Sequence, residues 1–118
     1  MTRFMVLQIQ GPMQRTDAES LLETTVKVRP TTDAVRAAWH LYSKACYIMA
    51  DEMDDVFRIG NIGPEDCIER IGYMHSISVG DVIINTHDKR IFYVDSLGFK
   101  QLPMAMVQHK WLKSAEGV

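Results

Sequence analysis

The stretch SISVGDVIINTHDKRIFYVDSLGFKQLP, residues 76–103, alternates apolar and polar positions and is broken by turn residues. Its first apolar run, DVIIN, is separated from the second, RIFYVDS, by a polar connection at residues 86–89. A period of two with a short polar break predicts two antiparallel strands joined as a hairpin. FKQL, residues 99–102, is long enough for a third strand before Pro103. This stretch therefore predicts the core of a small antiparallel sheet.

Gly80 and Asp81 stand where this stretch enters its first strand. Glycine permits a positive φ at a sharp turn, and an aspartate there can accept hydrogen bonds from nearby backbone N–H groups. The functional alternative makes Asp81 a catalytic acid or base, or a metal ligand, which requires a second carboxylate or a histidine beside it. No spacing in the sequence supplies that partner, and the glycine pattern of a phosphate-binding loop is missing. We therefore interpret the pair as structural.

The N-terminal stretch RFMVLQIQ, residues 3–10, predicts a further strand that ends at Gly11-Pro12. Alternation divides its side chains between two faces, with Phe4, Val6 and Gln8 on one and Met5, Leu7 and Ile9 on the other. Residues 13–30 allow two interpretations. Asp17 can cap a short helix, whereas the β-branched residues of TTVKV favour a strand.

Residues 31–45 predict a long helix, with Thr31 or Thr32 as its N-cap after Pro30. Apolar side chains recur there at steps of three and four and mark one buried face: Val35, Ala38, Trp39, Tyr42 and Ala45. Residues 46–50 can continue this helix or form a short strand.

Two more helices are predicted. The first covers residues 52–60 and is capped by Asp51, with Met53, Val56 and Phe57 facing inward. The second covers residues 104–115, with Met104, Val107 and Trp111 on one face.

The composition is that of an ordinary globular domain. The chain has 118 residues, 47% of them hydrophobic, which is enough to bury a core without disulfides or metals. A net charge of -2 and a pI near 6.0 leave no excess of Lys and Arg to attract nucleic acid or a membrane surface. We therefore expect residues 1–118 to form a single α+β domain, in which a small, mostly antiparallel β-sheet packs against two to three helices.

The N-terminus does not have the pattern of a signal peptide, and no apolar run approaches the ~18 residues of a membrane helix. We accordingly expect a cytoplasmic protein without a membrane partner, in which Cys46 and Cys67 are reduced.

Catalytic and metal-binding patterns are missing from the sequence. The histidines, His40, His75, His87 and His109, have no spacing typical of a zinc site, and a site built from them with the two cysteines would need long-range contacts throughout. His75 lies near two serines, but no G-x-S-x-G motif accompanies it. We expect no catalytic residue, cofactor or metal. The enzyme alternative is a small hydrolase with Asp81 or Asp95 and a histidine in one pocket.

Two features indicate a protein partner instead. An acidic cluster on the helix at residues 52–60 can stabilise the helix dipole or dock a basic partner. Methionines beside Trp111 on the last predicted helix suit adaptable recognition of a partner surface. The candidate partner-binding residues are Asp51, Glu52, Asp54, Asp55, Met104 and Trp111. A homodimer through a sheet edge or the last helix stays open.

The order DEMDDVFRIGN, MHSISVGDVI, polar turn and RIFYVDSLGFKQLP resembles the YodL-like module of small bacterial, phage and plasmid proteins. The resemblance covers residues 35–103 approximately and depends on Phe57, Asn61, Ser76, Ser78, Gly80, Asp81, Tyr93, Gly98 and Phe99. It implies a shared scaffold, with Phe57 and Phe99 as core anchors and Gly80 and Gly98 as backbone turns. It implies no agreed set of catalytic residues.

The leading hypothesis is a non-catalytic cytoplasmic protein that binds another protein, as an accessory or inhibitor protein of a mobile element. Two alternatives stay open: the small hydrolase, and a nucleic-acid-associated protein. The latter would have to gather basic side chains on one face: Arg29, Arg36, Arg58, Arg70, Lys89, Arg90, Lys100, Lys110 or Lys113.

Overall fold

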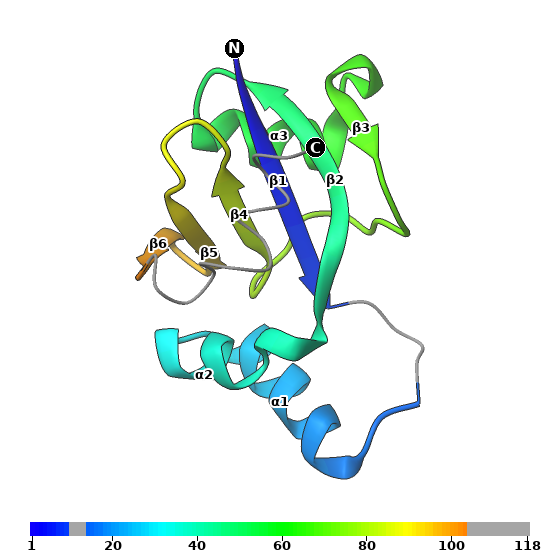
Figure 1. Ribbon diagram of the computed structural model, residues 1–118, viewed down its shortest axis with the longest axis vertical. Coiled ribbons are helices and arrows are strands. Elements are labelled where there is room, and N and C mark those ends of the chain that lie inside the picture. The colour runs from blue at the N-terminus through cyan, green and yellow to red at the C-terminus, as the bar shows by residue number, and fades with distance from the viewer. Residues whose placement is uncertain (10–13, 104–118) are drawn as a thin grey trace.

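The computed structural model describes residues 1–9 and 14–103. Its centre is a six-stranded sheet in the order β3-β2-β1-β4-β5-β6, with every neighbouring pair antiparallel (Figure 1). The strands are β1 (Thr2–Ile9), β2 (Tyr42–Ala50), β3 (Ile68–Arg70), β4 (Val82–Asn85), β5 (Ile91–Asp95) and β6 (Gly98–Leu102). The helices are α1 (Asp17–Val28), α2 (Thr32–Ala37) and α3 (Met53–Ile62), with 3-10 turns η1 (Trp39–Leu41) and η2 (Glu65–Cys67). The predicted α+β class is confirmed.

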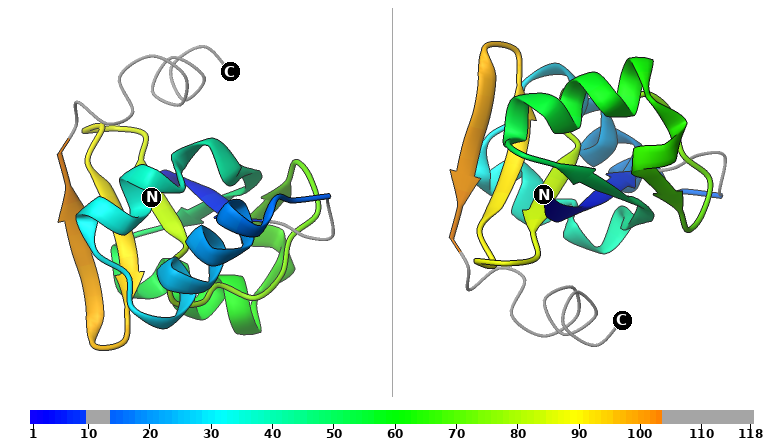
Figure 2. Two further views of the ribbon diagram at one scale, coloured as in Figure 1. Left: turned by 90° about the horizontal axis from the view of Figure 1, so that it is seen from below. Right: turned by 90° about the horizontal axis from the view of Figure 1, so that it is seen from above.

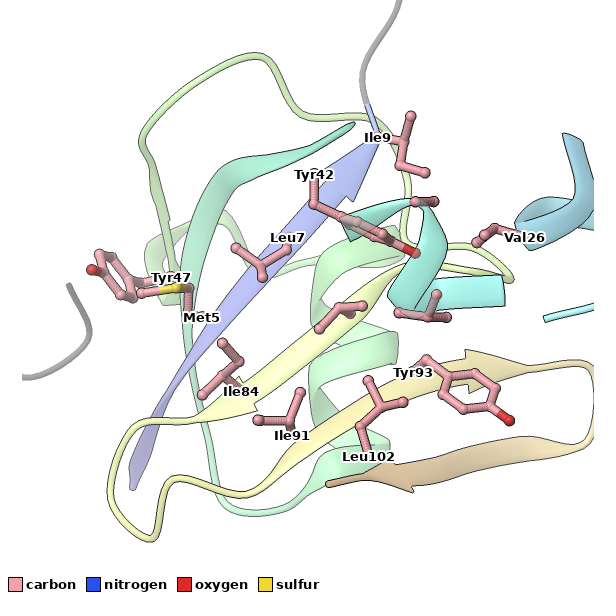
Figure 3. Close-up of a cluster of buried hydrophobic side chains, with 13 residues drawn as sticks. Met5, Leu7, Ile9, Val26, Tyr42, Tyr47, Ile84, Ile91, Tyr93 and Leu102 are labelled. Atoms are coloured by element: carbon pink, nitrogen blue, oxygen red, sulfur yellow. The ribbon is translucent and has the colours of Figure 1, made fainter. Parts of the chain in front are cut away.

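Both faces of the sheet are buried, as the pattern of β1 requires. Met5, Leu7 and Ile9 belong to the hydrophobic cluster drawn in Figure 3. Phe4 and Val6 belong to a second cluster on the opposite face. Because neighbouring side chains in a strand point to opposite faces, the predicted division of this strand is confirmed.

The helices lie on both sides of the sheet (Figure 2). Val26 of α1 and Val35 of α2 pack into the cluster that contains Met5. Val56 and Ile59 of α3 pack into the cluster on the other face. Burial of each such side chain contributes about 1.5–3 kcal/mol of transfer free energy. The sheet is therefore an interior layer between helices.

The long helix predicted at residues 31–45 is wrong beyond Ala37. Its start is as expected, because Thr31 is the N-cap and its side chain accepts a hydrogen bond from the backbone N–H of Ala34 at 3.0 Å. The chain then makes the η1 turn and becomes β2 from Tyr42 onward. Pairing along the central strand β1 supplies the backbone hydrogen bonds that a helix would otherwise provide. Residues 46–50, for which the sequence allowed either state, are strand.

The segment at residues 13–30 contains α1, and Thr16 rather than Asp17 caps this helix. The Thr16 hydroxyl accepts a hydrogen bond from the Glu19 backbone N–H at 3.1 Å, while the Glu19 carboxylate accepts one from the Thr16 backbone N–H at 3.0 Å. This reciprocal pair satisfies two backbone donors, and the apolar face of the helix is buried at Val26. Helix formation therefore outweighs the β-branched run in this segment.

The acidic helix predicted at residues 52–60 is confirmed as α3, although its cap differs from the prediction. Glu52, and not Asp51, holds the N-cap position, and its side chain makes no capping hydrogen bond. The helix predicted at residues 104–115 lies outside the described residues.

Candidate functional site

The segment SVGD, residues 78–81, lies directly before β4, and Asp81 connects it by hydrogen bonds to the sheet. This carboxylate is only 3% exposed. Its Oδ2 atom accepts hydrogen bonds from the Ser78 backbone N–H and from the Gln8 side-chain Nε2, each at 2.9 Å. The predicted hydrogen bonding between Asp81 and nearby backbone is confirmed.

Gln8 extends this network to His75. The buried Gln8 amide also donates to the His75 backbone carbonyl at 2.9 Å and accepts from the His75 backbone N–H at 3.2 Å. The Gln8 side chain of β1 thus forms hydrogen bonds with two residues of the loop between β3 and β4, His75 and Asp81. A buried amide without these partners would cost about 1–3 kcal/mol.

Gly80 is a structural glycine, as predicted. Its φ is +93°, and a Cβ atom there would lie 2.8 Å from Val26 Cγ1 and 2.9 Å from the Val26 carbonyl oxygen. The Tyr42 hydroxyl donates to the Gly80 carbonyl at 2.5 Å. Only glycine combines this backbone conformation with so close an approach of α1.

Burial dominates the electrostatics of this network. It raises the pKa of Asp81 to about 6, against the lowering effects of the hydrogen bonds from Ser78 and Gln8 and of the charges on His75 and Lys27. Burial also raises the pKa of Tyr42, and that of the Cys46 thiol to about 12. Both groups are therefore held in their neutral forms at physiological pH, and neither is an activated nucleophile.

The two carboxylates of the hydrolase alternative lie in different surroundings. Hydrogen bonds connect Asp81 to His75 through Gln8, which contacts the backbone of His75 and not its ring. A cleft of about 230 Å³ beside α3 is lined by His75 and Ser76 but not by Asp81. Asp95 lines a different groove, which has no histidine in its wall. No group of three or more His, Cys, Asp or Glu side chains suited to a metal ion occurs within residues 1–9 and 14–103.

That second groove joins two elements that are far apart in the sequence. It has a volume of about 260 Å³ and is lined by Asp54, Phe57, Val94, Asp95, Ser96, Gly98 and Phe99. The first two residues come from α3 and the others from the β5–β6 hairpin. The right view of Figure 2 shows α3 across one face of the sheet, with one end of the helix near β5 and β6. We call this feature the hairpin groove.

The hairpin groove combines negative charge with aromatic surface. Asp54 and Asp95 form no ion pair with any described Lys or Arg, although Asp95 accepts a hydrogen bond from the Ser96 backbone N–H at 2.8 Å. Phe57 is 40% exposed, so its predicted place as a core residue is wrong. Phe99 packs at the edge of the buried cluster under α3. Asp95 lies two residues after Tyr93, so strand alternation directs its side chain to the face of Tyr93 rather than that of Phe99. The Asp54 carboxylate beside the Phe57 ring suits a Lys or Arg side chain.

The structure separates the candidate partner-binding residues. Asp54 lines the hairpin groove. Asp55 instead pairs with Arg58 at 3.2 Å on the same helix, while Asp51 and Glu52 are exposed just before α3. Met104 and Trp111 lie outside the described residues.

The residues Phe57, Asp95 and Phe99, which line one groove, were not predicted to share a binding site. Two of these, Phe57 and Phe99, belong to the motif that resembles the YodL-like module, but they were interpreted as core anchors. The sequence signal for this site is an aromatic residue that follows acidic residues on a short helix.

Comparison of the chain with protein-family models, with curated proteins and with solved structures gave no match. The resemblance to the YodL-like module therefore rests on the motif residues alone. In the part of the chain that the structure describes, no helix is both long enough and apolar enough to cross a membrane.

Proposed function

We propose that this protein acts by binding another protein, and that the hairpin groove receives a Lys or Arg side chain of that partner. The observation that carries the proposal is the Asp54 carboxylate beside the exposed ring of Phe57 in the wall of this groove. Asp54 lies on α3 next to exposed aromatic surface, and it forms no ion pair with a described Lys or Arg. A partner's cation would supply the missing charge and stack on Phe57.

The groove alone would bind weakly. A cation on an aromatic ring is worth ~0.5–2 kcal/mol, depending on its exposure. An exposed ion pair adds about 0–1 kcal/mol. Specific complexes bury roughly 1,200–2,000 Å² in total, so the partner must also contact surface outside the groove.

We also propose a non-catalytic, cytoplasmic role as an accessory or inhibitor protein of a mobile element, in line with the resemblance to the YodL-like module. The burial of Asp81 and its separation from the His75 cleft support this role over the hydrolase. Pairing of many arginines with acidic side chains supports it over a nucleic-acid-associated protein: Arg36 with Asp33, Arg58 with Asp55, Arg70 with Glu65 and Arg90 with Asp88.

The test is quantitative capture of partners from the native host by the full chain, with identification by mass spectrometry. The variant Asp54→Asn/Asp95→Asn removes the charge of both acidic residues that line the groove, and the control Asp51→Asn/Glu52→Gln removes the same charge outside it. We expect the double groove variant to lose a protein that the wild type and the control retain. Equal recovery with all three chains would contradict a groove-mediated interaction, and loss with the control alone would place the interface before α3.

A further inference from the structure

The strand β6 forms one edge of the sheet. It pairs with β5 from Asp95↔Gly98 to Ile91↔Leu102, and the strand order gives it no second partner within the described residues. In an antiparallel ladder, alternate residues of an edge strand direct their N–H and C=O groups away from the neighbouring strand. β6 therefore offers a short row of backbone hydrogen-bonding groups, at the side of the sheet shown in Figure 1.

This edge adjoins the hairpin groove. Gly98 and Phe99 belong to β6 and also line the groove. A strand added beside β6 would lie about 4.8 Å away, with every second side chain on the same face of the sheet as Phe99. A long side chain on that face points toward the groove wall that carries Phe57 and Asp54.

The charges near the edge favour a foreign segment over a second copy of this chain. In the antiparallel register that would pair all five residues of two β6 strands, Lys100 of one copy would face Lys100 of the other. Like charges directly opposite destabilise a strand pair. Because Lys100 pairs with Tyr93, a residue of the cluster under α1 and α2, its side chain lies on the face away from the groove. The side chain of Lys100 therefore does not share the face of the sheet on which Phe99 lines the hairpin groove.

Building on the proposed function, we infer that the partner contributes an extended segment that pairs with β6 as a seventh strand and places a Lys or Arg side chain in the hairpin groove. Backbone pairing supplies the contact that the groove lacks, since strand addition gives affinity through main-chain hydrogen bonds and specificity through side-chain pockets. The position of the cation next to Gly98–Phe99 sets the register of the added strand.

The inference is tested by selecting linear peptides of random sequence on the immobilised full chain. Selection on the wild type is followed by counter-selection on Asp54→Asn/Asp95→Asn, with Asp51→Asn/Glu52→Gln as the matched control. We expect peptides with one Lys or Arg amid alternating β-branched residues, bound about tenfold more weakly by the groove variant and equally by the control. Two N-methylated forms of the best peptide, modified at alternate amides in opposite registers, then probe the backbone.

Strand addition predicts that one N-methylated form loses at least about tenfold in affinity while the other binds like the parent peptide, because only one set of amides faces β6. Dependence on the groove carboxylates with full tolerance of both N-methylated forms would overturn the strand inference and leave the proposed function standing. Peptides that bind the groove variant as well as the wild type would overturn the proposed function. Failure to enrich any linear peptide would overturn the strand inference.

Discussion

Replacing Asp81 by asparagine separates the two roles of its carboxyl group, as a hydrogen-bond acceptor and as a buried titrating group. The asparagine side-chain oxygen can still accept from the Ser78 backbone N–H and the Gln8 Nε2 atom. It cannot ionise. The variant therefore keeps the connection between the loop and β1, and any pH-dependent difference in stability between it and the wild type reports the charge of Asp81.

The size and sign of this difference follow from the raised pKa. The value of about 6 in the folded protein compares with 3.8 for an ordinary aspartate, so the fold retains a proton that the unfolded chain releases between these two pH values. Its stabilising effect is complete below the lower value and is lost as the pH rises through the higher one. At about 1.4 kcal/mol per pH unit, the wild type loses roughly 2–3 kcal/mol relative to Asp81→Asn between about pH 4 and about pH 7.5.

Urea unfolding of both proteins across this pH range, followed by circular dichroism, measures the difference. Comparison with the variant cancels the opposite slope from Glu23, whose pKa is lowered by Lys27 and Arg15 against the effect of its own burial. Asp33→Asn, at a side chain that is 94% exposed, controls for the loss of one carboxylate anywhere on the surface. A difference between the wild type and Asp81→Asn that is constant with pH would refute the assignment of a buried, titrating carboxyl to this position.

Further predictions concern the same loop and are also tested by urea unfolding. Gly80→Ala should cost more than Gly98→Ala. Both have positive φ, whose strain costs about 1–3 kcal/mol, but only at Gly80 does the new Cβ meet Val26, since nothing lies within 4 Å of it at Gly98. Equal losses would show that the contact with α1 is unimportant. Asn61→Ala removes the side chain that accepts from the Ile77 N–H at 2.6 Å and donates to the Ile77 carbonyl at 3.2 Å, and should cost about 1–3 kcal/mol. Ile62→Ala, at an 84% exposed residue, is the control, and a similar loss there would contradict this role.

Much of the sheet could be predicted because alternation along a strand is a local property. The pattern of residues 76–103 placed β4, β5 and β6 correctly, and the residues of β1 divided between two faces as expected. The spacing of apolar residues between Val35 and Ala45 was ambiguous in practice, because it fitted a helix although the segment is strand from Tyr42 onward. The segment from Tyr42 onward forms a strand because it can pair with β1, and β1 lies more than thirty positions earlier in the chain.

The sites depended still more on tertiary structure. The sequence by itself determined the class of fold, the turn at Gly80 and an acidic helix, because each of these depends on neighbouring residues. Only the tertiary structure decided that Gln8 meets Asp81 across 73 positions, and that Asp54 and Asp95 share one groove. Packing α3 onto one face of the sheet brings Asp54 and the end of β5 to the same groove. No local pattern encodes a distance between segments that meet only when both bury their apolar faces.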